Sequence, residues 1–213
     1  MTMAVQPATA QDLARYRAYA LNTSVESVIA ISGSRPGDVK TRHVRPARIQ
    51  QLEWSAPYVS VGAQMADPVR TLTFMFYNDA LYHITADYDR DRVAGLTVDE
   101  MVATISATYG TPVPVPARVA GRQVLPVGTV VLAGWEDGST SVLLVRRAYS
   151  SDLQLMLVWK ALAASATRAI TEAERLDVVE APRRDAERRQ QDAVEADAAR
   201  EKARTTNKAA FRP

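Results

Sequence analysis

The chain has 213 residues, of which 47% are hydrophobic, so it is long enough to bury a core in one or two small domains. Its 26 Lys and Arg residues nearly balance 24 Asp and Glu residues, and a net charge of +2 gives no strong field to attract nucleic acid. The absence of cysteine excludes disulfides, thiolate metal sites and a cysteine nucleophile. No apolar run approaches the length of about 20 residues that a transmembrane helix needs. We therefore expect neither a nucleic-acid partner nor a transmembrane segment.

One pattern occurs twice along the chain. Residues 20–32 and 94–106 align without a gap and carry Thr-x-x-Glu at the same place, just before an apolar run. This spacing is typical of a capping box, in which the hydroxyl accepts a backbone N–H three residues on and the carboxylate reaches back. The sequence therefore predicts a short helix at residues 23–32 and a second at residues 97–108.

Strand patterns follow each predicted helix. Residues 11–19 place Leu13, Tyr16 and Tyr19 at helical intervals, which indicates a lead-in segment or short helix, and residues 48–54 read as a strand. Residues 69–77 and 80–88 alternate apolar with other residues around the turn pair Asn78-Asp79, which predicts a β-hairpin. The alternation places Tyr82, Ile84 and Ala86 on the face of Leu72, Phe74 and Phe76, and Leu81 and His83 on the other face.

The second half of the chain repeats this order. Residues 130–135, 141–147 and 152–160 read as strands, and Asp137-Gly138 as a turn between the first two. We predict an α+β fold with two tandem helix-on-antiparallel-sheet units, residues 11–92 and 93–161, followed by a polar tail at residues 162–213. In the tail, residues 162–179 suit a helix and Pro182 interrupts it. Residues 183–204 are then either a solvated helix or largely disordered, because Val194 is their only large apolar residue.

Asp87, Asp89 and Asp91 alternate in a pattern that suggests a calcium loop. An EF-hand loop requires Gly at its sixth position and Glu at its twelfth, and here these positions hold Arg92 and Val98. Phosphate-binding glycine motifs are absent as well. We expect no metal and no cofactor.

The aromatic residues of the predicted strands have two interpretations. They either fill a shallow two-layer core, or they form a protein-binding surface on a sheet face that no helix covers. Under the second interpretation a charged residue within a predicted strand also belongs to the surface. The contact residues predicted on this basis are Trp54, Tyr58, Tyr77, His83 and Arg146.

The capped helix, the Gly-Thr-Pro sequence at residues 110–112 and the strand hairpins resemble the α+β repeat of outer-membrane assembly lipoproteins of the SmpA/OmlA type. Used in tandem, the repeat is similar to β-lactamase-inhibitor-protein-like folds. Residues 43–58 and 76–110 also resemble stretches of exported bacterial proteins of uncharacterised function. The resemblance covers residues 15–160, although the lipid-bearing cysteine of the assembly lipoproteins is absent. It implies that the chain acts through a broad sheet surface.

We therefore expect a non-enzymatic, envelope-associated protein that binds another protein through an exposed sheet face. Residues 4–10 are small and include Pro7, as in sequences that follow a removed leader, which favours a periplasmic or secreted location. One alternative is an enzyme that uses the carboxylates Glu53, Asp87 and Asp89 in a cleft between the two units. Another is a structural protein whose polar tail brings copies together.

Overall fold

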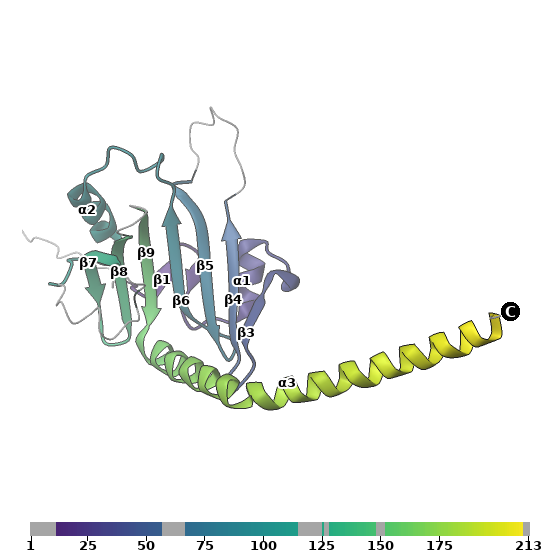
Figure 1. Cartoon of the computed structure of the whole chain (residues 1–213). Coiled ribbons are helices and arrows are strands. Elements are labelled where there is room, and N and C mark those ends of the chain that lie inside the picture. The colour runs from purple at the N-terminus through teal and green to yellow at the C-terminus, as the bar shows by residue number, and fades with distance from the viewer. Residues whose placement is uncertain (1–11, 57–66, 115–124, 126–127, 148–151, 211–213) are drawn as a thin grey trace, which may run out of the picture. The chain divides into compact units, whose positions relative to one another are not determined.

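The computed structural model describes residues 12–56, 67–114, 125, 128–147 and 152–210, and it has the predicted α+β architecture (Figure 1). The chain divides into two compact units, Met1–Ala169 and Ile170–Pro213. The elements in chain order are β1 (Arg15–Tyr16), β2 (Tyr19–Ala20), α1 (Val25–Ser32), a short 3-10 helix (Pro36–Asp38), β3 (Lys40–His43), β4 (Ile49–Ser55), β5 (Val69–Tyr77), β6 (Ala80–Tyr88), α2 (Val98–Tyr109), β7 (Thr129–Glu136), β8 (Thr140–Arg147), β9 (Leu153–Trp159) and α3 (Lys160–Ala210).

A single antiparallel sheet of seven strands organises the first compact unit. Its strand order is β3-β4-β5-β6-β9-β8-β7, while β1 and β2 form a separate hairpin. The strands of the two predicted repeats join where β6 pairs with β9, from His83 opposite Val158 to Asp87 opposite Gln154. Residues 11–92 and 93–161 therefore contribute to one continuous sheet. Residues 11–19 were predicted as a lead-in segment or a short helix; the described part forms the β1–β2 hairpin, so the helix alternative was wrong.

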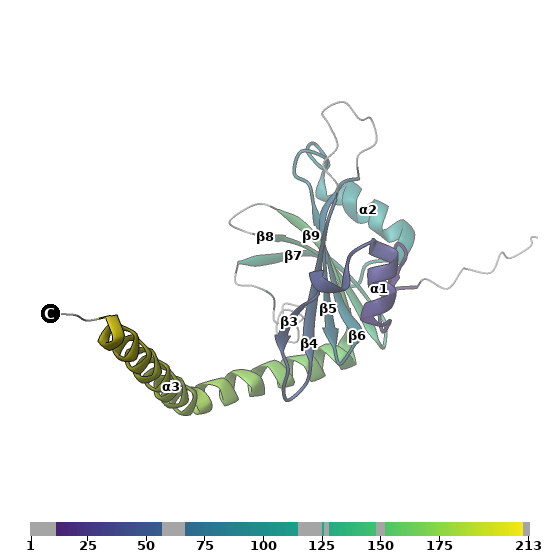
Figure 2. The same ribbon diagram turned by 90° about the vertical axis from the view of Figure 1, so that its right-hand side faces the viewer.

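The apolar core lies against one face of this sheet. The helices α1 and α2 are on the same side of the strands (Figure 2). Val25 and Val28 of α1, Tyr109 of α2 and Tyr16 and Tyr19 of the hairpin belong to one buried cluster with inward-facing strand residues. Those strand residues are Leu52, Val69, Leu72, Phe74, Phe76, Leu81, Ile84, Ala86, Ala133, Trp135, Val142, Leu144, Leu155 and Leu157. We call this side the helix-bearing face; the opposite side, on which neither α1 nor α2 packs, we call the helix-free face.

The β5–β6 hairpin confirms the prediction from the alternating pattern. Asn78 and Asp79 form its turn, and both have positive φ angles of 46° and 76°, as the preferred two-residue hairpin turns require. A bulge after Met75 changes the predicted faces near this turn. Leu81, rather than Tyr82, is opposite Phe76 and belongs to the core cluster, so the predicted assignment of Leu81 and Tyr82 was wrong. One inserted residue reverses the alternation locally, whereas His83 keeps its predicted face.

The predicted capping box forms in only one of the two copies. At the start of α2, the Thr97 hydroxyl accepts the Glu100 N–H at 3.2 Å, and the Glu100 carboxylate accepts the Thr97 N–H at 2.8 Å. The first copy was predicted wrongly. Ser24 caps α1 by accepting the Ser27 N–H, and the Thr23 hydroxyl instead donates to the Ala20 carbonyl. The N-cap of α1 is therefore Ser24, one residue later in the chain than predicted.

Substitution of the capping residues tests whether Thr97 caps α2 and Ser24, rather than Thr23, caps α1. Thr97→Ala and Ser24→Ala are each expected to lower the free energy of unfolding by about 1 kcal/mol, because each leaves an N–H of the first turn without its partner. Thr23→Ala is the comparison for the first copy, because it removes a hydroxyl that donates to the Ala20 carbonyl outside the helix and leaves the Ser24 cap in place. Urea unfolding compares the variants, and an unchanged free energy of unfolding in Ser24→Ala would show that Ser24 is not the cap.

α3 is one continuous helix of 51 residues, so the prediction that Pro182 interrupts it was wrong. Proline has no N–H and its ring displaces a carbonyl in the preceding turn. One guanidinium nitrogen of Arg184 donates to the Asp177 carbonyl at 3.2 Å and to the Asp177 carboxylate at 2.8 Å, across the turns on either side of Pro182. Further along, exposed pairs at short helical spacing, such as Arg200 with Asp197, support the helix without a buried face.

Candidate binding surface on the helix-free face

The structure divides the predicted contact residues between the two faces of the sheet. Tyr77 and His83 lie on the helix-free face, as shown by the pairing of Met75 with His83 and by the alternation along β5. Trp54 is opposite Leu72 and packs against the core cluster, so it lies on the helix-bearing face. Arg146 follows Leu144 by two residues and is exposed at the end of β8, on that same helix-bearing face. Tyr58 lies outside the described residues.

The middle of the helix-free face carries a band of mixed polarity. We define the central band as Thr71, Thr73, Met75, His83, Thr85, Asp87 and Gln154, which alternate along β5, β6 and β9 and are paired across the strands. All of these side chains are half-buried except Gln154, which is buried. Next to the band lies a small apolar cluster of Leu143, Val145 and Met156, against which Leu125 packs. The middle of the helix-free face is therefore of mixed polarity, with buried apolar residues beside it.

Polar groups of the central band are paired with one another. The Nε2 atom of His83 is 3.1 Å from the Thr85 hydroxyl. The Gln154 side-chain amide donates to the Asp87 carboxylate across the β6–β9 pair. These two pairs engage hydrogen-bonding groups of four of the seven residues of the band.

His83 is held in its neutral form. Desolvation by burial lowers the pKa of His83 from 6.5 to about 4. Its neighbours across the sheet are Met75 on one side and Val158 on the other, and neither offers a charge that would stabilise an imidazolium. At neutral pH the ring therefore adds an uncharged, amphipathic group to the band.

The carboxylates considered for an enzyme do not form one site. Asp87 is bound to Gln154 within the sheet, whereas Asp89 accepts the N–H groups of Asp91 and Arg92 and so closes the turn after β6. Glu53 is exposed on β4, two strands away from β6. The Asp89 carboxylate therefore has a local role in the turn. Among the described residues, no three His, Cys, Asp or Glu side chains gather in a way that would hold a metal ion.

A second polar cluster, which sequence reasoning missed, joins the β1–β2 hairpin to the sheet. The Arg17 guanidinium binds both carboxylate oxygens of Asp67 and lies 5.3 Å from the centre of the Tyr16 ring. The hydrogen bond with Arg17 lowers the pKa of Asp67, and burial raises the pKa of Tyr16, whose hydroxyl is hydrogen-bonded to Tyr88. Arg17 and Asp67 are 50 residues apart along the chain, and Tyr16 and Tyr88 are still further apart, so no local sequence motif predicts these pairs.

This hairpin cluster has a structural role, because it holds the β1–β2 hairpin against the rest of the first compact unit. Tyr109 of α2 donates its hydroxyl proton to the Arg15 carbonyl at 2.9 Å, so the hairpin is bound to α2 as well. The Asp67 carboxylate is engaged by Arg17 and also accepts the Val69 N–H. A paired carboxylate and phenols with raised pKa values offer little reactivity near neutral pH.

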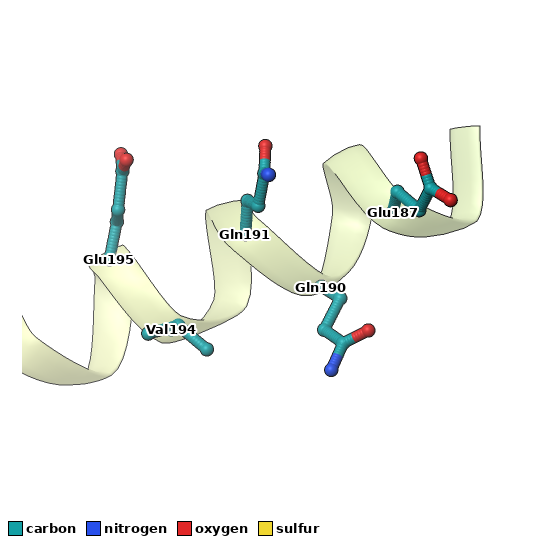
Figure 3. A pocket seen from close by; sticks show the side chains of 5 residues that line it. All are labelled: Glu187, Gln190, Gln191, Val194 and Glu195. Carbon is teal, nitrogen blue, oxygen red and sulfur yellow. The ribbon is translucent and has the colours of Figure 1, made fainter. Parts of the chain in front are cut away.

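In the second compact unit, a shallow hollow lies along α3 beside Val194. Figure 3 shows Glu187, Gln191 and Glu195 projecting from one side of the helix, and Gln190 and Val194 from the other. These side chains all come from one helix and do not converge on a common point. The hollow therefore does not provide an enclosed binding site.

Comparison of the chain with protein-family models, curated proteins and solved structures gave no match. The resemblance to the SmpA/OmlA repeat and to β-lactamase-inhibitor-protein-like folds therefore stays a prediction. Over the described part of the chain, no helix has both the length and the apolar character needed to cross a membrane.

Proposed function

We propose that this chain is a non-enzymatic binding protein that takes a protein partner on the helix-free face of its sheet. The observation that carries the proposal is the one-sided packing: α1, α2 and the β1–β2 hairpin all bury their apolar side chains on the helix-bearing face. The central band on the other side contains no Lys, Arg or Glu, and its Asp87 is paired with Gln154. Few charges at the centre, with Met75 in the band and Tyr77 next to it on β5, are typical of protein interfaces.

Tyr77 and His83 are the predicted contact residues that this surface retains. Tyr77 is half-buried at the end of β5, where a partner would cover the rest of its ring. Action outside the cytoplasm is part of the same proposal, and its support is the resemblance to exported proteins. Cell fractionation of the native organism tests the location separately from binding.

A charge placed in the central band tests the binding surface. In the variant Thr73→Arg with Thr85→Arg, two cations occupy neighbouring paired positions of the band. The partner is first identified by affinity capture from an extract of the native organism, and its binding to purified wild-type and variant chains is then measured by biolayer interferometry. We expect at least a tenfold loss, about 1.4 kcal/mol, because a partner would have to accommodate two long cationic side chains and remove water from them, although Glu53 lies opposite position 73.

The matched control is Thr104→Arg, which places the same side chain on the exposed surface of α2. Arginine at the half-buried positions can extend its guanidinium to water, so the double variant is expected to fold, and circular dichroism checks this. If the double variant unfolds, Tyr77→Ala is measured in its place. Equal affinity of a folded band variant and the wild type would overturn the proposal.

A further inference from the structure

The sheet has one edge that the described residues leave open. The seven strands end at β7 on one side and at β3 on the other. The β7 edge is met by an isolated bridge, in which the Val113 N–H donates to the Gly134 carbonyl at 2.8 Å. Within the described part of the chain, no strand or bridge borders the outer side of β3. Such an edge presents backbone N–H and carbonyl groups to which another strand can pair.

The β3 edge carries two positive charges on one face. Lys40 is opposite Gln51 in the β3–β4 pairing, and a register shift after Thr41 brings Arg42 close enough to donate to the Gln51 side-chain oxygen at 3.0 Å. Gln51 is in turn opposite Met75, so both cations lie on the helix-free side of the sheet. Their side chains are exposed, and neither makes an ion pair with any described residue.

We propose that β3 is a docking edge for an extended segment of a partner protein that carries acidic side chains at alternate positions. An added strand would form main-chain hydrogen bonds with β3, and alternate side chains of that strand would lie on the face of Lys40 and Arg42. Charge complementarity selects acidic residues at those positions. A second copy of this chain is a poor occupant, because pairing two β3 strands would oppose like charges. This inference is independent of the central band.

Peptide binding tests the edge directly. The full chain is titrated into a fluorescein-labelled peptide of alternating Glu and Thr, and binding is followed by fluorescence anisotropy. Two control peptides are compared: the same sequence N-methylated at alternate backbone amides, and a peptide of alternating Lys and Thr. We expect the Glu–Thr peptide to bind at least about tenfold more tightly than either control. Equal binding of the methylated peptide would show charge attraction without strand pairing and would overturn the proposal, as would no binding of the Glu–Thr peptide.

Charge reversal locates the bound peptide. In the variant Lys40→Glu with Arg42→Glu, we expect loss of the Glu–Thr peptide and a gain of affinity for the Lys–Thr peptide. Arg188→Glu with Lys202→Glu makes the same change in net charge at exposed positions of α3 and is expected to bind as the wild type does. Unchanged binding by the β3 variant would overturn the proposal. The variant Thr73→Arg with Thr85→Arg should retain peptide binding, which distinguishes this edge from the central band.

Discussion

Replacement of Trp135 by alanine is expected to lower the free energy of unfolding by about 3–5 kcal/mol. The Trp135 side chain is only 1% exposed, and its indole N–H donates to the Gly110 carbonyl at 2.8 Å. Its ring centre is 6.5 Å from that of Tyr109, whose hydroxyl binds the β1–β2 hairpin. Removal of the indole therefore opens a cavity between β7 and the end of α2 and also leaves a buried carbonyl without its donor.

Two further variants separate these contributions in urea unfolding experiments. Trp135→Phe keeps an aromatic ring but removes the N–H, and it is expected to cost less than Trp135→Ala. Trp54→Ala is the matched control, since Trp54 packs on the same core cluster but is only half-buried. A loss for Trp54→Ala as large as that for Trp135→Ala would contradict the central position of Trp135 in the core.

Acidification from pH 7 towards pH 4 is expected to lower the free energy of unfolding through His83. Burial lowers the pKa of His83 to about 4, whereas in the unfolded chain it is near 6.5. Between these values the unfolded state binds more protons than the native state, so stability falls as the pH decreases. At about 1.4 kcal/mol per pKa unit, the loss is at most about 3 kcal/mol, and less to the extent that water reaches the half-buried ring.

Urea unfolding at pH 7 and at pH 4.5 measures this loss. His83→Leu should remove most of the difference between the two pH values, because leucine suits a position between Met75 and Val158 and does not titrate. His43→Gln, which removes the only other imidazole, is the control and should keep the difference. Carboxylates such as Asp67, whose pKa is lowered by Arg17, lose their contribution only at still lower pH. An unchanged pH dependence in His83→Leu would refute the assignment.

The pairing of the strands explains why only some of the predicted binding residues lie on the same face of the sheet. The alternation of β5 and β6 placed His83 with Met75 and Thr73 on one face, because residues two apart in a strand share a face. Trp54 lies on the other face, and that depends on the register of β4 against β5, in which Trp54 is opposite Leu72. Register is set by pairing partners and by burial, and neither can be read from the strand alone.

Local signals in the sequence determined the second helix cap, the Asn78-Asp79 turn and the β5–β6 hairpin, because each depends on groups within a few residues of one another. Tertiary structure decided the rest. Pairing of β6 with β9 joins the two predicted repeats in one sheet, and the bulge after Met75 brings Leu81 into the core. Helices α1 and α2 pack on one face of the sheet, and burial on the other face keeps His83 neutral. These outcomes depend on contacts between segments that are far apart in the sequence. Such contacts form only in the folded chain, so a local sequence pattern does not predict them.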